Sequence, residues 1–338
     1  MSPTIDVVIP TYNSMPWLPL AVESVLKQTY KNIKVYVVDD GSTDGTAKYI
    51  KTIKDKRLHY IKKANGGVSS ARNAGIAEAS SDFIAFLDAD DVWYPEKLQK
   101  QFELIKKDNG VGLVYGHHYI IDEEGVILRN HRTWKRGYIA DDLAGGNLIA
   151  GSASMVLLRR SVLDQVGLFH EELVNGEDWE LWLRIALVSK VDFVPEILMA
   201  VRQHDKNAQF NAKKMADGLL STYKQIKKTV PLSPLQRRRV AAYCLYHAAD
   251  LNLRAGERWQ AKKMLLYFFT QNPRDFFQTE NWEIHVNSAL FPRVIFGNPL
   301  FDFLKRVVRK LVKLFLRFIK LCLKPFKFVI SKLYRAIR

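Results

Sequence analysis

Three carboxylates within four residues follow an apolar run at 83–87, and they are the clearest candidates for chemistry in the chain. Asp88, Asp90 and Asp91 would repel one another unless a positive charge offset them. A hard divalent cation prefers such oxygen ligands, and it would also bind a diphosphate and stabilise its charge as that group leaves. The structural alternative is that these residues cap and charge the first turn of a helix expected at 95–106.

Two polar turns carry groups suited to a nucleotide. Asp39 and Asp40 end an apolar run, where a carboxylate could accept a hydrogen bond from a base or a ribose, or could cap a turn. Gly66 and Gly67 open a helical stretch that contains Arg72, so backbone N–H groups and a guanidinium could hold phosphate. The spacing of this turn argues against a nicotinamide site and excludes a P-loop.

A second acidic pair and a histidine complete the candidate set. Glu177 and Asp178 begin a helical stretch, where they could compensate the helix dipole or supply a general base that deprotonates an acceptor hydroxyl. His204 follows the last strand-like run, and its side chain could be structural or could bind a metal ion or a phosphate.

Strand-like and helical stretches alternate along the chain and place these residues in loops. Such alternation predicts βαβ units, hence an α/β fold with a Rossmann-like, mainly parallel sheet that binds ligands at the carboxyl ends of its strands. The predicted strands are Asp6–Pro10, Ile33–Val38, Leu58–Lys62, Phe83–Leu87, Val111–Gly116, Val126–Leu128, Ser152–Leu158 and, broken by Pro195, Val191–Val201. The predicted helices are 17–28, 43–52, 69–79, 95–106 and 177–187.

Five motifs in order resemble glycosyltransferase family 2, with its GT-A fold, over about residues 4–205. The motifs are VVIPTYN at 7–13, VVDDGSTDGT at 37–46, NGGVSSARNAGI at 65–76, FLDADD at 86–91 and GEDWELWLR at 176–184. The resemblance implies transfer of a sugar from a nucleotide-diphosphate donor, with uracil as the expected base, inversion of the anomeric centre, and Mn²⁺ or Mg²⁺ as cofactor. The QxxRW motif and multiple spans of processive members are missing, so we expect one sugar per encounter.

The resemblance also assigns roles to individual residues. Asp90 is expected to bind the metal ion beside the donor diphosphate, and Asp88 to contact the ribose or the metal. Asp178, beside Glu177, is expected to be the general base, and His204 is a candidate metal ligand. The nucleotide pocket is expected to be lined by Pro10, Tyr12, Asp39, Asp40, Asn65, Arg72 and Asp88.

Basic residues are concentrated at the end of the chain, which has 338 residues and a net charge of +16. Residues 303–338 hold twelve Lys or Arg and no acid, which leaves a net charge of +4 for the rest. On a helical wheel the basic side chains at 306–324 fall within an arc of about 100°, opposite a broad apolar face.

Because no apolar run at 309–324 exceeds three residues, the tail favours a helix lying in an anionic membrane surface over a spanning helix. The alternative is packing against the rest of the chain or a partner. The apolar face argues against nucleic-acid binding.

We expect three regions: a GT-A domain at 1–212, a small helical annex at 213–292 and a basic amphipathic tail at 293–338. The annex contains a helical hairpin at 237–270 that is either structural or a single partner-binding repeat. The two cysteines give no disulfide framework and no signal-peptide pattern opens the chain. We therefore expect a peripheral protein on the cytoplasmic face of a membrane.

The expected acceptor is a hydroxyl of a lipid-linked or cell-surface glycan. One alternative is a polyprenyl-phosphate glycosyltransferase, whose phosphate acceptor needs little general base, so the pair at Glu177 and Asp178 favours the hydroxyl. The other is a degenerate fold that serves as a membrane scaffold, against which the intact Asp88, Asp90 and Asp178 argue.

Overall fold

The structure is a computed structural model, and it describes residues 2–149, 151–205 and 211–271. The predicted tail at 293–338 and the last part of the predicted annex, 272–292, lie outside the described residues.

The chain divides after Ala255 into two units. Residues 1–255 form one compact unit, which extends beyond the predicted boundary at residue 212. Helix α10, Arg258–Gln271, belongs to the second unit and matches the second half of the predicted helical hairpin.

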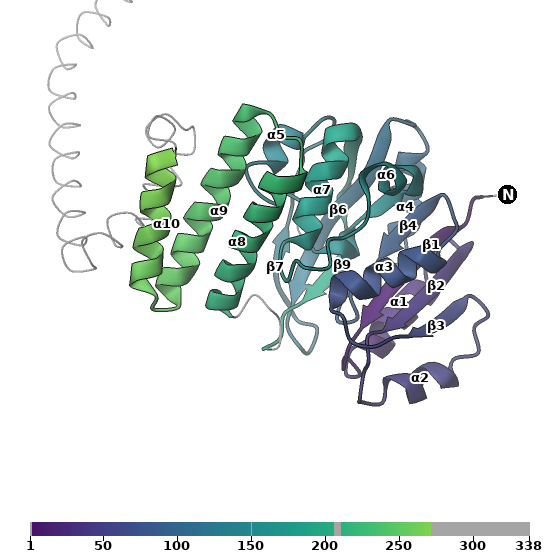
Figure 1. Ribbon diagram of the computed structural model, residues 1–338. Coiled ribbons are helices and arrows are strands. Elements are labelled where there is room, and N and C mark those ends of the chain that lie inside the picture. The colour runs from purple at the N-terminus through teal and green to yellow at the C-terminus, as the bar shows by residue number, and fades with distance from the viewer. Residues whose placement is uncertain (1, 150, 206–210, 272–338) are drawn as a thin grey trace, which may run out of the picture. The chain divides into compact units, whose positions relative to one another are not determined.

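A nine-stranded sheet forms the centre of the first unit (Figure 1). Its order is β3-β2-β1-β4-β8-β6-β9-β5, with β7 paired to β6. The strands are β1 (Ile5–Thr11), β2 (Ile33–Asp39), β3 (Leu58–Lys62), β4 (Phe83–Phe86), β5 (Val92–Trp93), β6 (Val111–Ile121), β7 (Ile127–His131), β8 (Leu157–Arg159) and β9 (Lys190–Arg202). Every residue of β1 is buried, as expected for a strand covered on both faces.

The strand directions bring the polar loops to one edge. Strands β1 to β4 pair in parallel, and β6 is parallel to β9. Because β8 is antiparallel to both β4 and β6, the latter two run the same way. The carboxyl ends of β1, β2, β4, β6 and β9 therefore meet at one edge of the sheet, which confirms the expected α/β class with a Rossmann-like sheet.

Helices cover both faces of this sheet. The backbone N–H of Leu98 in α4 donates to the side chain of Gln28 just after α1, which puts these two helices together. Helices α3, α6 and α7 lie over the other face (Figure 1). The helices are α1 (Leu18–Leu26), α2 (Thr46–Thr52), α3 (Val68–Glu78), α4 (Lys97–Ile105), α5 (Ala140–Leu143), α6 (Arg160–Val166), α7 (Glu177–Val188), α8 (Ala212–Thr229) and α9 (Pro234–Arg254).

Helix α3 approaches the sheet unusually closely because it carries a glycine at the contact. A Cβ atom added at Gly75 would lie 2.3 Å from Cγ1 of Val8 in β1. The close approach fixes the height of α3 above the sheet, and with it the position of Arg72 one turn earlier.

Helices α8 and α9 pack on each other and against the sheet-covering helices α5 and α7. Ser233 and Gln236 form a capping box at the start of α9, and the side chain of Gln236 also donates to Asp141 of α5 at 2.8 Å. None of the described helices has both the length and the hydropathy needed to cross a bilayer.

Two predicted strands differ from the structure. The strand predicted at Ser152–Leu158 is wrong in its first half, because Ala153–Met155 forms a 3₁₀ turn and β8 begins only at Leu157. Strand β9 continues past Pro195, and the predicted break is a bulge at which the pairing with β6 skips from Val194 to Ile197. The proline occupies a bulge, where its missing N–H removes no ladder bond.

Candidate active site

The guanidinium of Arg72 joins the two acidic clusters of the sequence. Its side chain is 2% exposed, Nη2 donates to Oδ1 of Asp88 at 2.8 Å, and Nη1 donates to Oε1 of Glu177 at 2.9 Å. Burial alone would lower the pKa of Arg72, but the two carboxylates raise it above its usual value. The end of β4 and the start of α7, far apart in sequence, therefore border one site.

Both carboxylate oxygens of Asp88 accept hydrogen bonds, Oδ1 from Arg72 and Oδ2 from Ser152. Oδ2 accepts a hydrogen bond from the hydroxyl of Ser152 at 2.6 Å, and the backbone N–H of Asp88 donates to Oγ of Ser154 at 2.8 Å. Ser152 has a φ of +54°, which is strained for a residue with a side chain. The sequence predicts a strand at 152–158 here, and its small residues are the one signal for this support.

The carboxylate of Asp90, in the loop after β4, contacts His204, which follows β9. Its Oδ2 lies 2.9 Å from Nε2 of His204, and the imidazole stacks on Trp17 with ring centroids 4.0 Å apart. The neighbouring Asp91 is buried and accepts from the backbone N–H of Arg202 at 3.1 Å. Burial, then the charges of Asp90 and Asp88, raise the pKa of Asp91 well above its usual range.

Asp90 and His204 are the described residues that could hold a divalent cation. Within the described part of the chain no three His, Cys, Asp or Glu side chains gather as a metal-binding group. Asp90 and His204 nevertheless present a carboxylate and an imidazole side by side, in an acidic cluster that a cation would neutralise. Mg²⁺ and similar ions often take one or two protein ligands and complete their shell with substrate phosphates and water, so the pair fits such an ion.

The glycine turn before α3 is already occupied by a carboxylate. Asp40 accepts from the backbone N–H groups of Gly66 and Gly67 at 3.0 and 2.8 Å, and Nζ of Lys63 donates to it at 2.7 Å. The expectation that these N–H groups hold phosphate is therefore corrected: they bind the chain's own anion, which is buried and salt-bridged.

The other predicted nucleotide residues lie at the ends of β1 and β2 and in the loop after β3. Oδ1 of Asp39 accepts from the backbone N–H of Ser42 at 2.7 Å, and its Oδ2 accepts from the hydroxyl of Tyr60. Tyr12 is 52% exposed just beyond buried Pro10 and can take a planar base. The side chain of Asn65 donates to the backbone oxygen of Asp40 at 3.0 Å, so it holds the loop.

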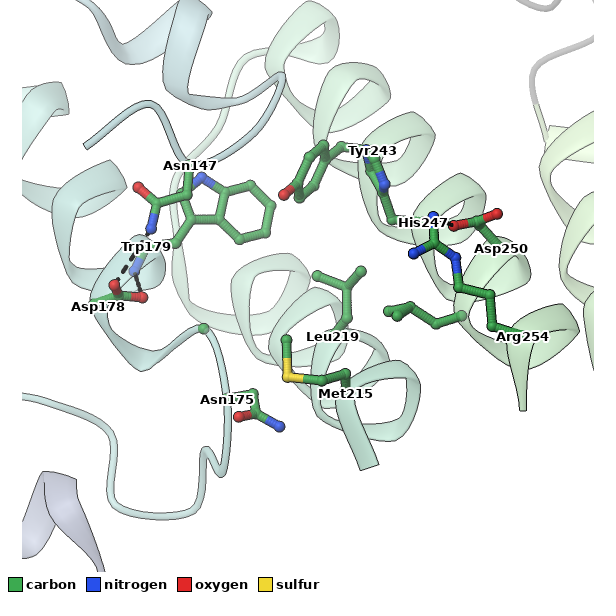
Figure 2. Close-up of a pocket in the computed structure, with 12 residues that line it drawn as sticks. Asn147, Asn175, Asp178, Trp179, Met215, Leu219, Tyr243, His247, Asp250 and Arg254 are labelled. Carbon is green, nitrogen blue, oxygen red and sulfur yellow. Dashed lines mark hydrogen bonds and ion pairs between the residues drawn. The ribbon is translucent and has the colours of Figure 1, made fainter. Parts of the chain in front are cut away.

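Asp178 follows Glu177 in α7, and it lines a cavity of about 360 Å³ (Figure 2). Oδ1 accepts from the backbone N–H of Trp179 at 2.6 Å, and the side chain of Asn147 donates to Oδ2 at 3.3 Å. Desolvation and the neighbouring charge of Glu177 raise the pKa of Asp178 to about 7. A carboxyl with this pKa is suited to general-base catalysis near neutral pH.

Helices α8 and α9 form the far wall of the cavity. The ring of Tyr243 packs edge-on against Trp179 at 5.0 Å and lies 4.4 Å from His247, while Met215 and Leu219 of α8 line the cavity below them (Figure 2). None of these residues was a sequence candidate, because only tertiary packing brings them to Asp178.

One turn further along α9 the cavity ends in an ion pair. The guanidinium of Arg254 lies 2.6 Å from the carboxylate of Asp250 (Figure 2). The cavity therefore presents an aromatic wall, amide groups and two carboxylates, those of Asp178 and Asp250.

Comparison with known protein sequences finds a matching family description and several similar chains. The family description "Glycosyl transferase family 2" matches residues 6–167, which include Asp88 and Asp90. An uncharacterized glycosyltransferase of Rickettsia bellii is 36% identical over 64% of this chain, but the chain spans only 31% of that protein. WfgD of Escherichia coli, named as a UDP-Glc:alpha-D-GlcNAc-diphosphoundecaprenol beta-1,3-glucosyltransferase, is 31% identical, with 54% of this chain and 69% of WfgD covered.

Solved structures share the fold. S. aureus TarS in complex with UDP-GlcNAc superposes with a TM-score of 0.60 at 19% identity, covering 78% of this chain and 80% of that one. The mannosyltransferase PcManGT of Pyrobaculum calidifontis, in complex with GDP-Man and Mn²⁺, gives a TM-score of 0.54 at 15% identity, covering 90% and 83%. These likenesses confirm the expected GT-A fold.

Proposed function

Because the chain belongs to glycosyl transferase family 2, we propose that it transfers one sugar from a nucleotide-diphosphate donor, a UDP-sugar, to a hydroxyl of a glycan or lipid-linked acceptor. The observation that carries this proposal is the bridge made by Arg72, which holds Asp88 and Glu177 within hydrogen-bond distance of one guanidinium. The bridge sets donor-side and acceptor-side carboxylates on two walls of one site.

Asp178 supplies the base in this reaction. Its carboxylate takes the proton of the acceptor hydroxyl, the oxygen attacks the anomeric carbon, and the bond to the diphosphate breaks on the opposite side, which inverts that centre. Mn²⁺ or Mg²⁺ held by Asp90 and His204 would offset the charge that develops on the leaving diphosphate. Arg72 and Ser152 fix the carboxylate of Asp88 beside the place where the metal ion is expected. Asp88 therefore adds negative charge to the metal site.

The cavity favours a hydroxyl acceptor over a phosphate acceptor. The cavity that Asp178 lines contains a second carboxylate, Asp250, and Arg254, the guanidinium among its lining residues, is already paired with that carboxylate. A neutral sugar, unlike a phosphate, is not repelled by these carboxylates, and its apolar face can stack on an aromatic ring such as Tyr243. The name of WfgD, a sugar-to-sugar transferase with a lipid-linked acceptor, supports the same choice.

The metal and donor assignments are tested together by calorimetry. We expect UDP-sugar binding to require Mn²⁺ in the wild type and to be lost in Asp90→Ala, since one of two protein ligands is removed. Asp217→Asn, which removes an exposed carboxylate of α8, is the matched control and should bind as the wild type does. Unchanged metal-dependent affinity in Asp90→Ala would contradict the assignment, and absence of binding by every nucleotide sugar would contradict the function.

We also propose that the enzyme works at the cytoplasmic face of a membrane, held peripherally by the tail at 293–338 on anionic lipids. The support is the composition of the tail, where twelve basic residues and no acids at 303–338 alternate with short apolar runs. An acceptor with a lipid anchor would be presented at such a surface.

A further inference from the structure

A buried serine, Ser154, ties together both ends of the segment 88–93, which carries the donor-side acids. Its Oγ accepts from the backbone N–H of Asp88 at 2.8 Å, and its backbone oxygen accepts from Nε1 of Trp93 at 2.8 Å. The side chain of Ser154 also hydrogen-bonds the buried carboxylate of Asp91. One fully buried residue therefore contacts this segment at its start, its middle and its end.

The turn that contains Ser154 is shaped by its surroundings. Ser152, just before the 3₁₀ turn Ala153–Met155, has a φ of +54°, and such a conformation persists only where neighbouring groups impose it. One constraint comes from β6. A Cβ atom added at Gly151 would lie 3.2 Å from Nδ1 of His118, so this buried imidazole packs directly on the backbone before the turn.

Two buried side-chain donors hold the backbone oxygens of this turn. Nε1 of Trp93 in β5 donates to the oxygen of Ser154, and Nε2 of Gln101 in α4 donates to the oxygen of Met155 at 2.7 Å. The same amide nitrogen of Gln101 donates to the backbone oxygen of Val114 in β6 at 3.0 Å. The turn is therefore fixed to β5, α4 and β6 at once.

Lys97 orients both of these donors. Its Nζ lies 3.9 Å from the ring centre of Trp93 and donates to Oε1 of Gln101, one turn along α4, at 2.8 Å. Because the amide oxygen of Gln101 faces Lys97, its NH₂ group is the one that faces the turn. Lys97 is fully buried and makes no ion pair with a carboxylate in the part of the chain that the structure describes. A buried lysine without a counter-ion costs stability, so packing alone does not account for it.

We propose that Ser154 is a positioning residue of the donor site, held in place by Trp93 and Gln101, and that it sets the affinity for the metal ion and the nucleotide diphosphate. Asp90 lies in the segment whose two ends Ser154 ties, so a shift of either end moves the carboxylate that is proposed to bind the ion. The inference rests on the proposed function, because it concerns how the acids of that site are held for a donor.

Calorimetry with Mn²⁺ and UDP tests this role in the full chain. Ser154→Ala removes the hydroxyl that bonds Asp88 and Asp91, and we expect it to weaken Mn²⁺-dependent binding of UDP by about 10–100-fold, the range for residues that orient metal ligands. The matched control is Ser189→Ala, which removes a buried hydroxyl bonded to the backbone oxygen of Ile185, at the end of α7 and just before β9. This control should bind UDP as the wild type does.

A second variant leaves the hydroxyl in place and removes the bond from Trp93 to the turn. Trp93→Phe keeps an aromatic ring beside Lys97 but deletes the N–H donor, so we expect a several-fold loss of UDP affinity. Its control is Trp182→Phe, because Trp182 is also buried and its Nε1 has no hydrogen-bond partner among the described residues. Both variants should lose similar stability in urea, so a loss of affinity confined to Trp93→Phe is not a general effect of truncating the core.

The double variant separates a positioning role from a structural one. Because Trp93 acts through the turn, Ser154→Ala with Trp93→Phe should bind UDP no more weakly than Ser154→Ala alone. Multiplication of the two losses would overturn the proposal, and so would wild-type affinity in both single variants. If Ser154→Ala does not fold, the comparison of Trp93→Phe with Trp182→Phe decides alone, and equal affinities there would refute positioning. A wild type that binds no UDP with Mn²⁺ would instead contradict the proposed function, and this inference with it.

Discussion

Replacing Asp178 with Asn should slow the enzyme and at the same time stabilise it at alkaline pH. The base is lost, so turnover should fall by about 10²–10⁴-fold with little change in donor affinity. The wild-type rate should rise as the pH passes through about 7, because the pKa of Asp178 is raised to about 7 and only the ionised carboxylate accepts the proton.

The stability effect follows from the same pKa. The carboxyl of an unfolded chain has a pKa of about 3.9, so folding raises the pKa of Asp178 by about three units, equivalent to roughly 4 kcal/mol. A group whose pKa is raised by folding contributes stability that is fully present below the unfolded pKa and is lost as the pH rises through the folded pKa. Asn does not titrate, so the variant gains on the wild type by roughly 2 kcal/mol between about pH 5.5 and about pH 8.5.

Urea unfolding at these two pH values measures the gain, and the comparison between them cancels the pH-independent cost of the substitution. Asp217→Asn on the exposed face of α8 is the control and should show no pH-dependent difference from the wild type. If Asp178→Asn tracks the wild type at both pH values, the carboxyl is not held with a raised pKa. If its turnover is normal, Asp178 is not the base.

Two further predictions concern the bridge and the tail. Arg72→Lys should lower the free energy of unfolding by about 3 kcal/mol, because one ammonium cannot bond both carboxylates and one of them is left buried and uncompensated. Adding Glu177→Gln should recover part of that loss in urea unfolding, whereas simple addition of the two costs would contradict the bridge. Deleting residues 303–338 should release most of the chain from anionic vesicles in a sedimentation assay while donor hydrolysis continues, and an unchanged bound fraction would contradict attachment by the tail.

The sheet and the donor-side acids could be predicted because their signals are local. Apolar runs that end in polar clusters predicted β1 to β4, and strand polarity alone places Asp39 and Asp88 at one edge. The bulge at Pro195 could not be predicted, since a proline in a strand and a proline that ends a strand look alike in sequence. The phosphate interpretation of Gly66 failed for a related reason: the anion that fills the turn is Asp40, from the loop that follows β2.

The residues proposed for the acceptor side could not all be predicted, because tertiary packing brings them together and no sequence motif records it. The pair Glu177 and Asp178 was recognised, but the sequence did not show that the first acid binds Arg72 while the second faces a cavity. The far wall of that cavity comes from helices that the sequence predicted only as a small helical annex. Contacts such as that between Trp179 and Tyr243 require the fold of the whole unit.

The cavity behind Asp178 has a consequence for how such an enzyme diversifies. Its far wall is built by α8 and α9, which follow the stretch matched by the family description, while the residues on the donor side come from the sheet edge. Since we propose that this cavity takes the acceptor, we expect substitutions in those two helices to change what is glycosylated without altering what is donated. Grafting the segment 212–254 between related chains is therefore a route to exchange one recipient for another while the transferred sugar stays the same.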